Sequence, residues 1–161
     1  MNNTKITAII GVAIISVIGW LLRRVIMLRV EVLNPLLYSE DGTFGLEAVI
    51  KELEIMVNRK DTFYIRNNKW NWSNIYHKYH GWLFLIPKNI ISKIESFDNK
   101  YKKLLGEEFI GAAQYKIDAK DKEVLQEAIC LLENAKELQA FLNKCLDSFW
   151  YYEIISRFVK V

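Results

Sequence analysis

The two histidines, His77 and His80, come closest in residue type and spacing to a chemical site. On a helix they share one face, and a His-x-x-His pair can supply two ligands to zinc. A zinc site needs further ligands, and no Cys, Asp or Glu lies at a suitable nearby spacing. The alternatives are a catalytic role, or histidines that are exposed or satisfied locally. We predict that the chain holds no metal and no cofactor.

A mixture of aromatic and basic residues surrounds these histidines. Ten of the 21 aromatic residues lie between Phe63 and Tyr101, interleaved with lysines and arginines. The rings could stack on unpaired bases while the cations hold phosphates. They could also lie at a membrane interface, where indole and phenol rings concentrate, or fill the core of a helical bundle. The candidate nucleic-acid or interface residues are Arg66, Lys69, Trp70, Trp72, His77 and His80.

Motifs of the common enzyme classes are missing from the sequence. It has no glycine-rich phosphate loop, no nucleophile elbow and no zinc-ligand quartet. Cys130 lies near an apolar helical stripe and Cys145 lies within it, so core packing is favoured over nucleophilic chemistry. Two thiols make no disulfide framework and suit a reducing compartment. We therefore predict a protein without catalytic residues that is not an enzyme.

The elements that position these residues are predicted to be helices. The first ends at Leu33, because Pro35 steers the residue before it away from helical geometry. A second is indicated by the apolar stripe of residues 46–57, with Thr43 as its cap. A third occupies residues 87–105 and starts with a proline. From Val124 the apolar residues follow a 4-3-4-3 pattern, which predicts one long helix or two nearly collinear helices with a break at Ser148. The predicted fold class is all-α, a helical bundle.

The amino-terminal segment is predicted to span a membrane. Seventeen residues without charge, Ile6 to Leu22, precede Arg23 and Arg24. At about 1.5 Å per residue they reach roughly 26 Å, the lower limit for crossing the hydrocarbon core. A secretory signal peptide is the main alternative, but no small-x-small cleavage site follows. The predicted spanning residues include Ile6, Thr7, Gly11, Ile15, Gly19, Trp20 and Leu22.

The basic residues beside this segment predict its orientation. Arg23, Arg24 and Arg29 follow the span, whereas Lys5 and the amino terminus precede it. The more basic flank stays in the cytoplasm. We predict a single-pass protein of the cell inner membrane, with residues 1–33 as the anchor and residues 34–161 as a cytoplasmic helical domain.

Charge is unevenly distributed within the predicted domain. Residues 31–161 sum to −1, but residues 59–103 carry +7 and residues 104–153 carry −5. These regions could meet between neighbouring copies of the protein or within one subunit.

The whole chain resembles a family in architecture and composition. One amino-terminal membrane helix, an all-helical cytosolic domain of about 130 residues and a composition rich in Lys, Asn and Ile are similar to the small membrane accessory proteins of type VI-B CRISPR systems. The resemblance implies a HEPN-like helical domain, a ring-shaped membrane assembly and a role beside an RNA-guided effector protein in antiviral defence. The HEPN signature is an arginine, usually followed by a polar residue, with a histidine after four to six intervening residues. Arg66 and Asn67 match its start, but Asn71, Trp72 and Ser73 stand where the histidine is required.

The anchor also carries a signal for self-association. Thr7, Gly11 and Gly19 fall on one third of the helix circumference, and small residues let helix backbones approach closely in lipid. Our first hypothesis is a non-enzymatic membrane protein that assembles into a pore-like homo-oligomer and acts in antiviral defence. The alternatives are a membrane-tethered ribonuclease built on Arg66, His77 and His80, and a tethered binding module that recruits a cytosolic partner.

Overall fold

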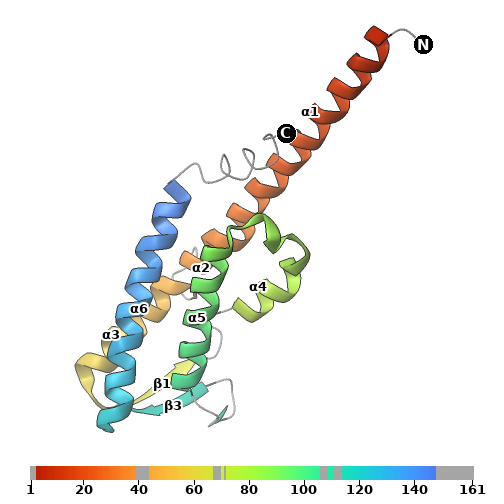
Figure 1. Cartoon of the computed structure of the whole chain (residues 1–161). Helices are drawn as coiled ribbons and strands as arrows, with labels where there is room; N and C mark the ends of the chain where they lie inside the picture. The colour runs from red at the N-terminus through yellow and green to blue at the C-terminus, as the bar shows by residue number, and fades with distance from the viewer. Residues whose placement is uncertain are drawn as a thin grey trace.

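The computed structural model describes residues 3–38, 44–66, 70, 72–105, 109–110 and 114–147. These residues form mostly helices and one small sheet (Figure 1). The helices and helical turns are α1 (Asn3–Leu28), η1 (Arg29–Leu33), α2 (Asn34–Leu37), α3 (Leu46–Arg59), α4 (Trp72–Tyr79), η3 (His80–Leu85), α5 (Lys88–Leu105) and α6 (Lys122–Asp147). The strands are β1 (Thr62–Arg66), β2 (Phe109–Ile110) and β3 (Gln114–Asp118). The predicted all-α fold is confirmed in so far as the described residues are mostly helical, and the small sheet was not predicted.

The first helical path continues through Pro35 to Leu37, so its predicted end at Leu33 is wrong. In a regular α-helix the proline ring would collide with the carbonyl four residues earlier. Here η1 is a π-helical turn, in which the Asn34 N–H donates to the carbonyl of Arg29. This wider turn shifts the carbonyls just before the proline, and the chain therefore stays helical.

Helix α3 begins at Leu46 with Gly45 as its N-cap residue, in place of the predicted cap Thr43, which lies outside the described residues. Gly45 has a φ of 88°, a conformation that L side chains rarely adopt. A Cβ at this position would lie 3.1 Å from the Pro35 carbonyl oxygen and 3.2 Å from that of Leu37. Glycine therefore allows α3 to start close against α2.

The core lies among α3, α5 and α6, with α6 packed against both other helices. The predicted apolar stripes of these helices supply most of it. On α6, Ala128, Leu131, Ala135, Leu138 and Leu142 are all buried. On α5, the buried apolar residues are Ile90, Ile94, Phe97, Tyr101, Leu104 and Leu105. The predicted long helix is observed from Lys122 to Asp147, and the predicted break at Ser148 lies outside the described residues.

The small sheet covers the end of the bundle that lies farthest from the tip of α1 (Figure 1). Strand β3 is central and pairs antiparallel with β1 and β2. Ile65 and Ile117 are buried, whereas the directly paired Tyr64 and Lys116 are exposed. This alternation places one face of the sheet against the helices.

Helix α1 projects from the bundle (Figure 1). We call its projecting part, from Asn3 to Trp20, the rod. The carboxyl-terminal end of α1 belongs to the core, because Val25 and Leu28 are buried there, as are Val32 and Leu33 of η1. The predicted anchor, residues 1–33, therefore ends inside the domain that it carries. The carboxyl-terminal end of α1 thus packs in the same hydrophobic cluster as the core helices.

Candidate functional site

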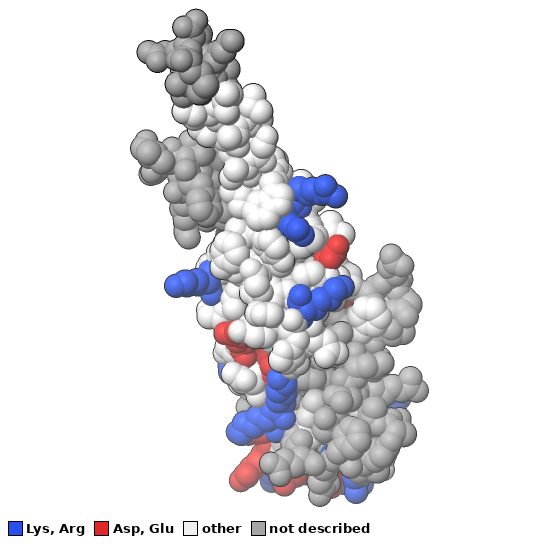
Figure 2. Space-filling view, turned by 90° about the vertical axis from the view of Figure 1, so that its right-hand side faces the viewer, with Lys and Arg blue, Asp and Glu red and all other residues white. Residues whose placement is uncertain are grey.

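The described side chains of the rod are mostly apolar and exposed. Ile9, Val12 and Ile15 are 63%, 66% and 71% exposed. The helical path from Ile9 to Leu37 is long and apolar enough to cross a membrane by length and composition, and only 6% of its most apolar stretch is buried. On the side of the molecule that Figure 2 shows, the described part of the rod has no charged side chains, and lysines and arginines first appear at its base. A core helix of a soluble domain would instead be covered by its neighbours.

An aromatic and cationic cluster lies at the base of the rod. We call Trp20, Arg24 and Trp82 the interface cluster. The Trp20 and Trp82 rings meet edge to face, with centroids 5.4 Å apart. The Arg24 guanidinium carbon lies 4.4 Å from the Trp82 centroid and 5.7 Å from the Trp20 centroid. Stacked cation–π contacts of this kind each contribute about 0.5–2 kcal/mol. The cluster thus fastens η3 to α1 where the apolar segment ends.

Polar contacts continue this junction toward the domain. The Tyr79 hydroxyl donates a hydrogen bond to the Glu31 carboxylate, which connects α4 to η1. The Lys78 ammonium lies 4.9 Å from the Tyr79 ring centroid. The pKa of Lys78 is raised, chiefly by its side-chain hydrogen bond with Tyr79 and further by the Glu31 carboxylate. Lys78 therefore remains a cation at neutral pH.

Trp70 and Trp72, predicted as nucleic-acid or interface residues, are buried at 7% and 3% exposure. The Trp70 indole N–H donates to Asp98 Oδ1 at 3.0 Å, and the Trp70 ring packs edge to face on Phe97. Asp98 Oδ2 in turn lies 2.6 Å from the Lys102 ammonium. Both indoles are occupied in the core, so their faces are not presented to bases or to lipid.

Replacing Asp98 by alanine should lower the free energy of unfolding by about 2–3 kcal/mol. Asp98 is 5% exposed, and its loss leaves the buried Trp70 indole N–H without its acceptor. Thermal unfolding of the full chain in detergent, followed by circular dichroism, measures the effect. Glu95→Ala, an exposed change on the same helix, should alter stability by less than about 0.5 kcal/mol. Equal effects of the two variants would contradict the assignment of this buried network.

Of the remaining predicted candidates, only His77 and His80 have described side chains. His77 and His80 are exposed, and His80 Nδ1 lies 3.1 Å from the His77 carbonyl oxygen. Arg66 is the last residue of β1 and its side chain lies outside the description, as does all of Lys69. Among the described residues, no group of three or more His, Cys, Asp or Glu could hold a metal ion.

The predicted spanning and orienting residues lie along α1 and η1. Ile6 and Thr7 lie in α1, with side chains outside the description. The other predicted residues are Gly11, Ile15, Gly19, Trp20, Leu22, Arg23 and Arg24 on α1, with Arg29 opening η1. Arg23 is exposed, while Leu22 and Arg29 are half-buried. The three arginines form no ion pair with any described residue.

Two important residues were difficult to predict from the sequence. Trp82 lies 62 positions after Trp20, and nothing local indicates that they meet. Asp98 resembles an ordinary surface acid of α5, because the polar residues Asn99 and Lys100 follow it on the chain. An aspartate one residue after the buried Phe97 was the available signal, since it extends the inner face of that helix.

Comparisons with protein-family models, with curated proteins and with solved structures found no match to this chain. The functional argument therefore rests on the residues and geometry of the rod and its base.

Proposed function

We propose that α1 anchors this protein in the cell inner membrane as a single-pass protein, with its helical domain in the cytoplasm. The observation that carries the proposal is the bare apolar surface of the rod, from Ile9 to Trp20. Exposed to water, such surface is unfavourable by about 25 cal/mol per Å². Lipid hydrocarbon removes this penalty, and the helix satisfies its own backbone hydrogen bonds there.

The interface cluster supports this placement. Tryptophan rings concentrate at the boundary between lipid and water, and arginine side chains extend toward the headgroups. Both indoles and the Arg24 guanidinium lie at the end of the apolar segment. Phe84, two residues beyond Trp82 in η3, is a further apolar side chain of this turn and is 69% exposed.

The orientation of the protein is tested by fusing reporters to its carboxyl terminus. Green fluorescent protein should fluoresce there, and alkaline phosphatase should stay inactive, because three arginines follow the span. Replacing Arg23, Arg24 and Arg29 together by glutamine should produce mixed orientation. The matched control is glutamine at three lysines of α5, Lys88, Lys93 and Lys100. These lysines are too many residues from the span along the chain to affect its insertion. An active phosphatase fusion on the unmodified chain would contradict the orientation.

We further propose that the protein acts without catalysis, by assembling into a pore-like homo-oligomer. Gly11 and Gly19 support close helix contact, because a Cβ at either position would meet no described atom within 4 Å. A second helix therefore has room to approach this face, which Thr7 shares by helical spacing. Because a single helix cannot line a channel, any pore requires several copies, and an uncharged lining would open by wetting.

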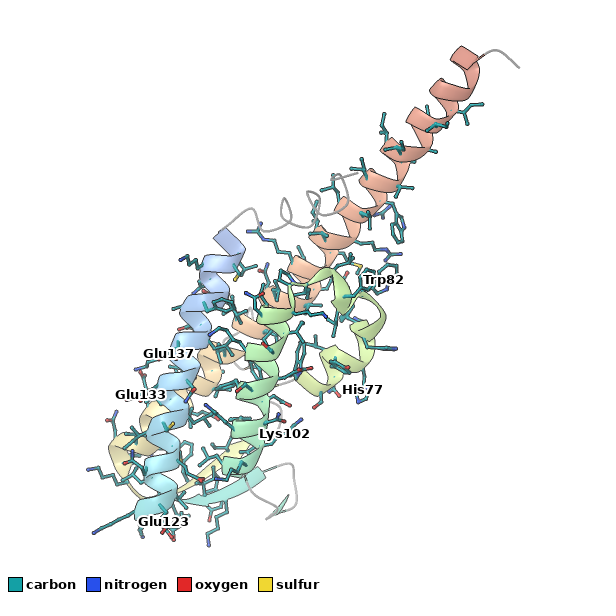
Figure 3. All side chains as sticks on the ribbon, in the orientation of Figure 1. His77, Trp82, Lys102, Glu123, Glu133 and Glu137 are labelled. Carbon is teal, nitrogen blue, oxygen red and sulfur yellow. The ribbon has the colours of Figure 1, made fainter. Side chains whose placement is uncertain are left out.

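Charge supplies a second kind of contact for assembly. Lys103 and Glu127 already join the +7 and −5 regions within one subunit. Glu123, Glu133 and Glu137 are exposed on α6 and form no ion pair with any described residue (Figure 3). These three carboxylates are the available partners for basic residues of a neighbouring copy. Such pairs are individually weak and sensitive to salt.

The resemblance in architecture leads us to propose a role in antiviral defence, as an accessory to an RNA-guided effector protein. The assembly would permeabilise the membrane when that effector is activated. Phage challenge of cells that carry such an effector, with and without this protein, tests the role. Equal protection in both strains would contradict it, while leaving the membrane anchoring untouched.

A further inference from the structure

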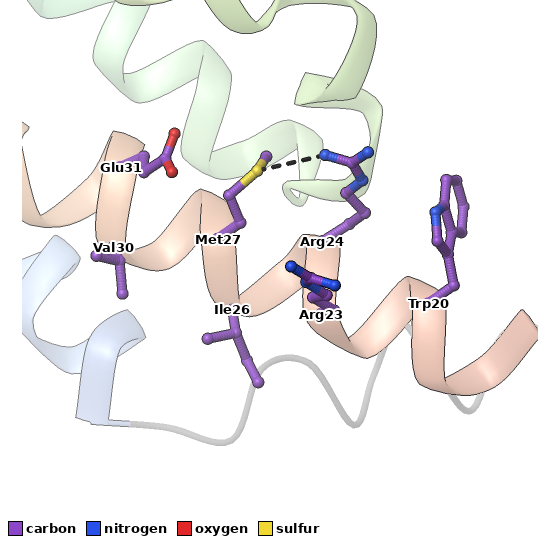
Figure 4. Close-up of a pocket in the computed structure, with 7 residues that line it drawn as sticks. All are labelled: Trp20, Arg23, Arg24, Ile26, Met27, Val30 and Glu31. Atoms are coloured by element: carbon purple, nitrogen blue, oxygen red, sulfur yellow. Dashed lines mark hydrogen bonds between the residues drawn. The ribbon is translucent and has the colours of Figure 1, made fainter. Parts of the chain in front are cut away.

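A groove of about 580 Å³ runs along α1 and η1 at the base of the apolar segment (Figure 4). Its described lining changes in character along the helix. Trp20 lies at the end nearer the membrane segment, and Arg23 and Arg24 follow. Met27 and Glu31 lie toward the domain. The groove therefore has an aromatic end, a cationic middle and an acidic far end.

Arg24 is held in this groove by contacts that leave its charge uncompensated. Its guanidinium stacks on Trp82 and lies near Trp20, and its Nη1 donates to the Met27 sulfur at 3.5 Å. Stacking occupies the flat faces of a guanidinium, while its N–H donors lie in the plane around the edge. The side chain is thus oriented in advance, which reduces the entropy lost when it binds an anion.

The cationic middle of the groove has no protein anion in the described structure. Neither Arg23 nor Arg24 forms an ion pair with any described carboxylate. Glu31 accepts the hydrogen bond of Tyr79 and lies seven residues from Arg24, about 10 Å along the helix. Among the described residues, therefore, no carboxylate pairs with either of these two adjacent guanidinium groups.

These guanidinium groups lie at the depth of lipid phosphates if the apolar segment fills the hydrocarbon. Arg23 and Arg24 follow Leu22, the last residue of that segment, by about 1.5 and 3 Å along the helix axis. The headgroup layer on each side of a bilayer is about 5–7 Å thick. The groove thus opens at the level where phosphodiesters are most concentrated.

We propose that this groove binds the phosphodiester of an anionic glycerophospholipid. The inference rests on the proposed membrane anchoring. Arg24 donates to the phosphate from its stacked position, and Arg23 closes over it from the exposed side of the helix. Trp20 contacts the first carbons of an acyl chain. Bidentate arginine contacts to phosphate are stronger than neutral hydrogen bonds and require this planar geometry.

The position of Glu31 favours a lipid over a larger soluble phosphate compound. A ligand that extended toward the domain would bring further negative groups near this carboxylate. A lipid extends in the opposite direction, past Trp20 and along the apolar rod. Bound lipid would fix the rotation and depth of α1, because the same arginine fastens η3 to the helix.

Native mass spectrometry of the full chain in detergent tests the proposal, with phosphatidylglycerol and phosphatidylcholine as probes. We expect phosphatidylglycerol to bind about tenfold more tightly than phosphatidylcholine. Arg24→Gln should remove most of this preference, and Trp82→Leu should weaken it about threefold by releasing the guanidinium. Arg59→Gln, the same change at the far end of α3, is the matched control and should retain the preference.

Each outcome supports or overturns the site. Equal binding of the two lipids, or an unchanged preference in Arg24→Gln, would overturn it. Displacement of the lipid by millimolar sodium phosphate would assign the groove to soluble phosphate and overturn the lipid. Alkaline carbonate extraction of the unmodified chain is run in parallel: its release from membranes contradicts the anchoring itself, whereas firm retention without lipid preference overturns the groove alone.

Discussion

Ile15→Arg should transfer the protein from the membrane fraction to the soluble or aggregated fraction. Ile15 lies near the middle of the apolar segment and is 71% exposed. An arginine at the centre of a membrane helix costs about 3 kcal/mol on insertion scales, which lowers the inserted fraction about a hundredfold. The segment barely spans the hydrocarbon, so a shift along the membrane normal cannot rescue it. Alkaline carbonate extraction measures the result.

Ile15→Leu is the matched control, because it preserves apolarity and size at the same position. We expect its membrane fraction to equal that of the unmodified chain. The experiment also distinguishes anchoring from a soluble fold. On an exposed surface of a soluble protein, arginine at position 15 would improve solubility without loss of structure. That result would contradict the proposed anchor and the functions that depend on it.

Gly11→Ile should weaken self-association about tenfold, equivalent to about 1.4 kcal/mol. A branched side chain on the small-residue face separates the backbones of two packed helices. Mass photometry in detergent should show a multimer of the unmodified chain. The variant should dissociate at a higher protein concentration than the unmodified chain does. Conductance across planar bilayers should fall in parallel, because pore formation requires the assembled state.

Ala13→Ile provides the control for this change. It adds comparable bulk to the same helix but on nearly the opposite face, because residues 11 and 13 are separated by about 160° around the helix axis. Its assembly and conductance should match those of the unmodified chain. Equal losses in both variants would indicate a general effect of side-chain volume. A protein that is monomeric at every salt and protein concentration would contradict the pore and favour the tethered binding module.

Several features could be predicted from sequence because they depend on neighbouring residues. The apolarity of residues 6–22 and the arginines after them are local properties, and they predict a spanning helix however the domain folds. The helices at 88–105 and 122–147 followed from apolar spacing, since a 3.6-residue period puts one stripe against a core. In each helix the predicted stripe is the buried one.

Other features depended on contacts between residues far apart in the chain. From composition alone Trp70 and Trp82 are equivalent, because both could stack on bases, lie at a membrane interface or fill a core. The structure instead buries Trp70 on Asp98 and leaves Trp82 half-buried against Trp20 and Arg24. Periodicity cannot distinguish these outcomes, because it reports which face of a helix is apolar and not which partner covers it.

The path of the backbone at Pro35 and the small sheet were decided in the same way. A proline normally ends a helix, but the π-turn before it and the burial of Leu36 and Leu37 keep the chain helical. Strands β1 and β3 have only five residues each, and their pairing joins segments about fifty residues apart. The sequence by itself determined the apolar amino-terminal helix, its basic flank and the main helices. Tertiary packing decided which aromatic residues lie at the base of the rod, because burial depends on the contacts that the whole chain makes and not on the spacing of its neighbours.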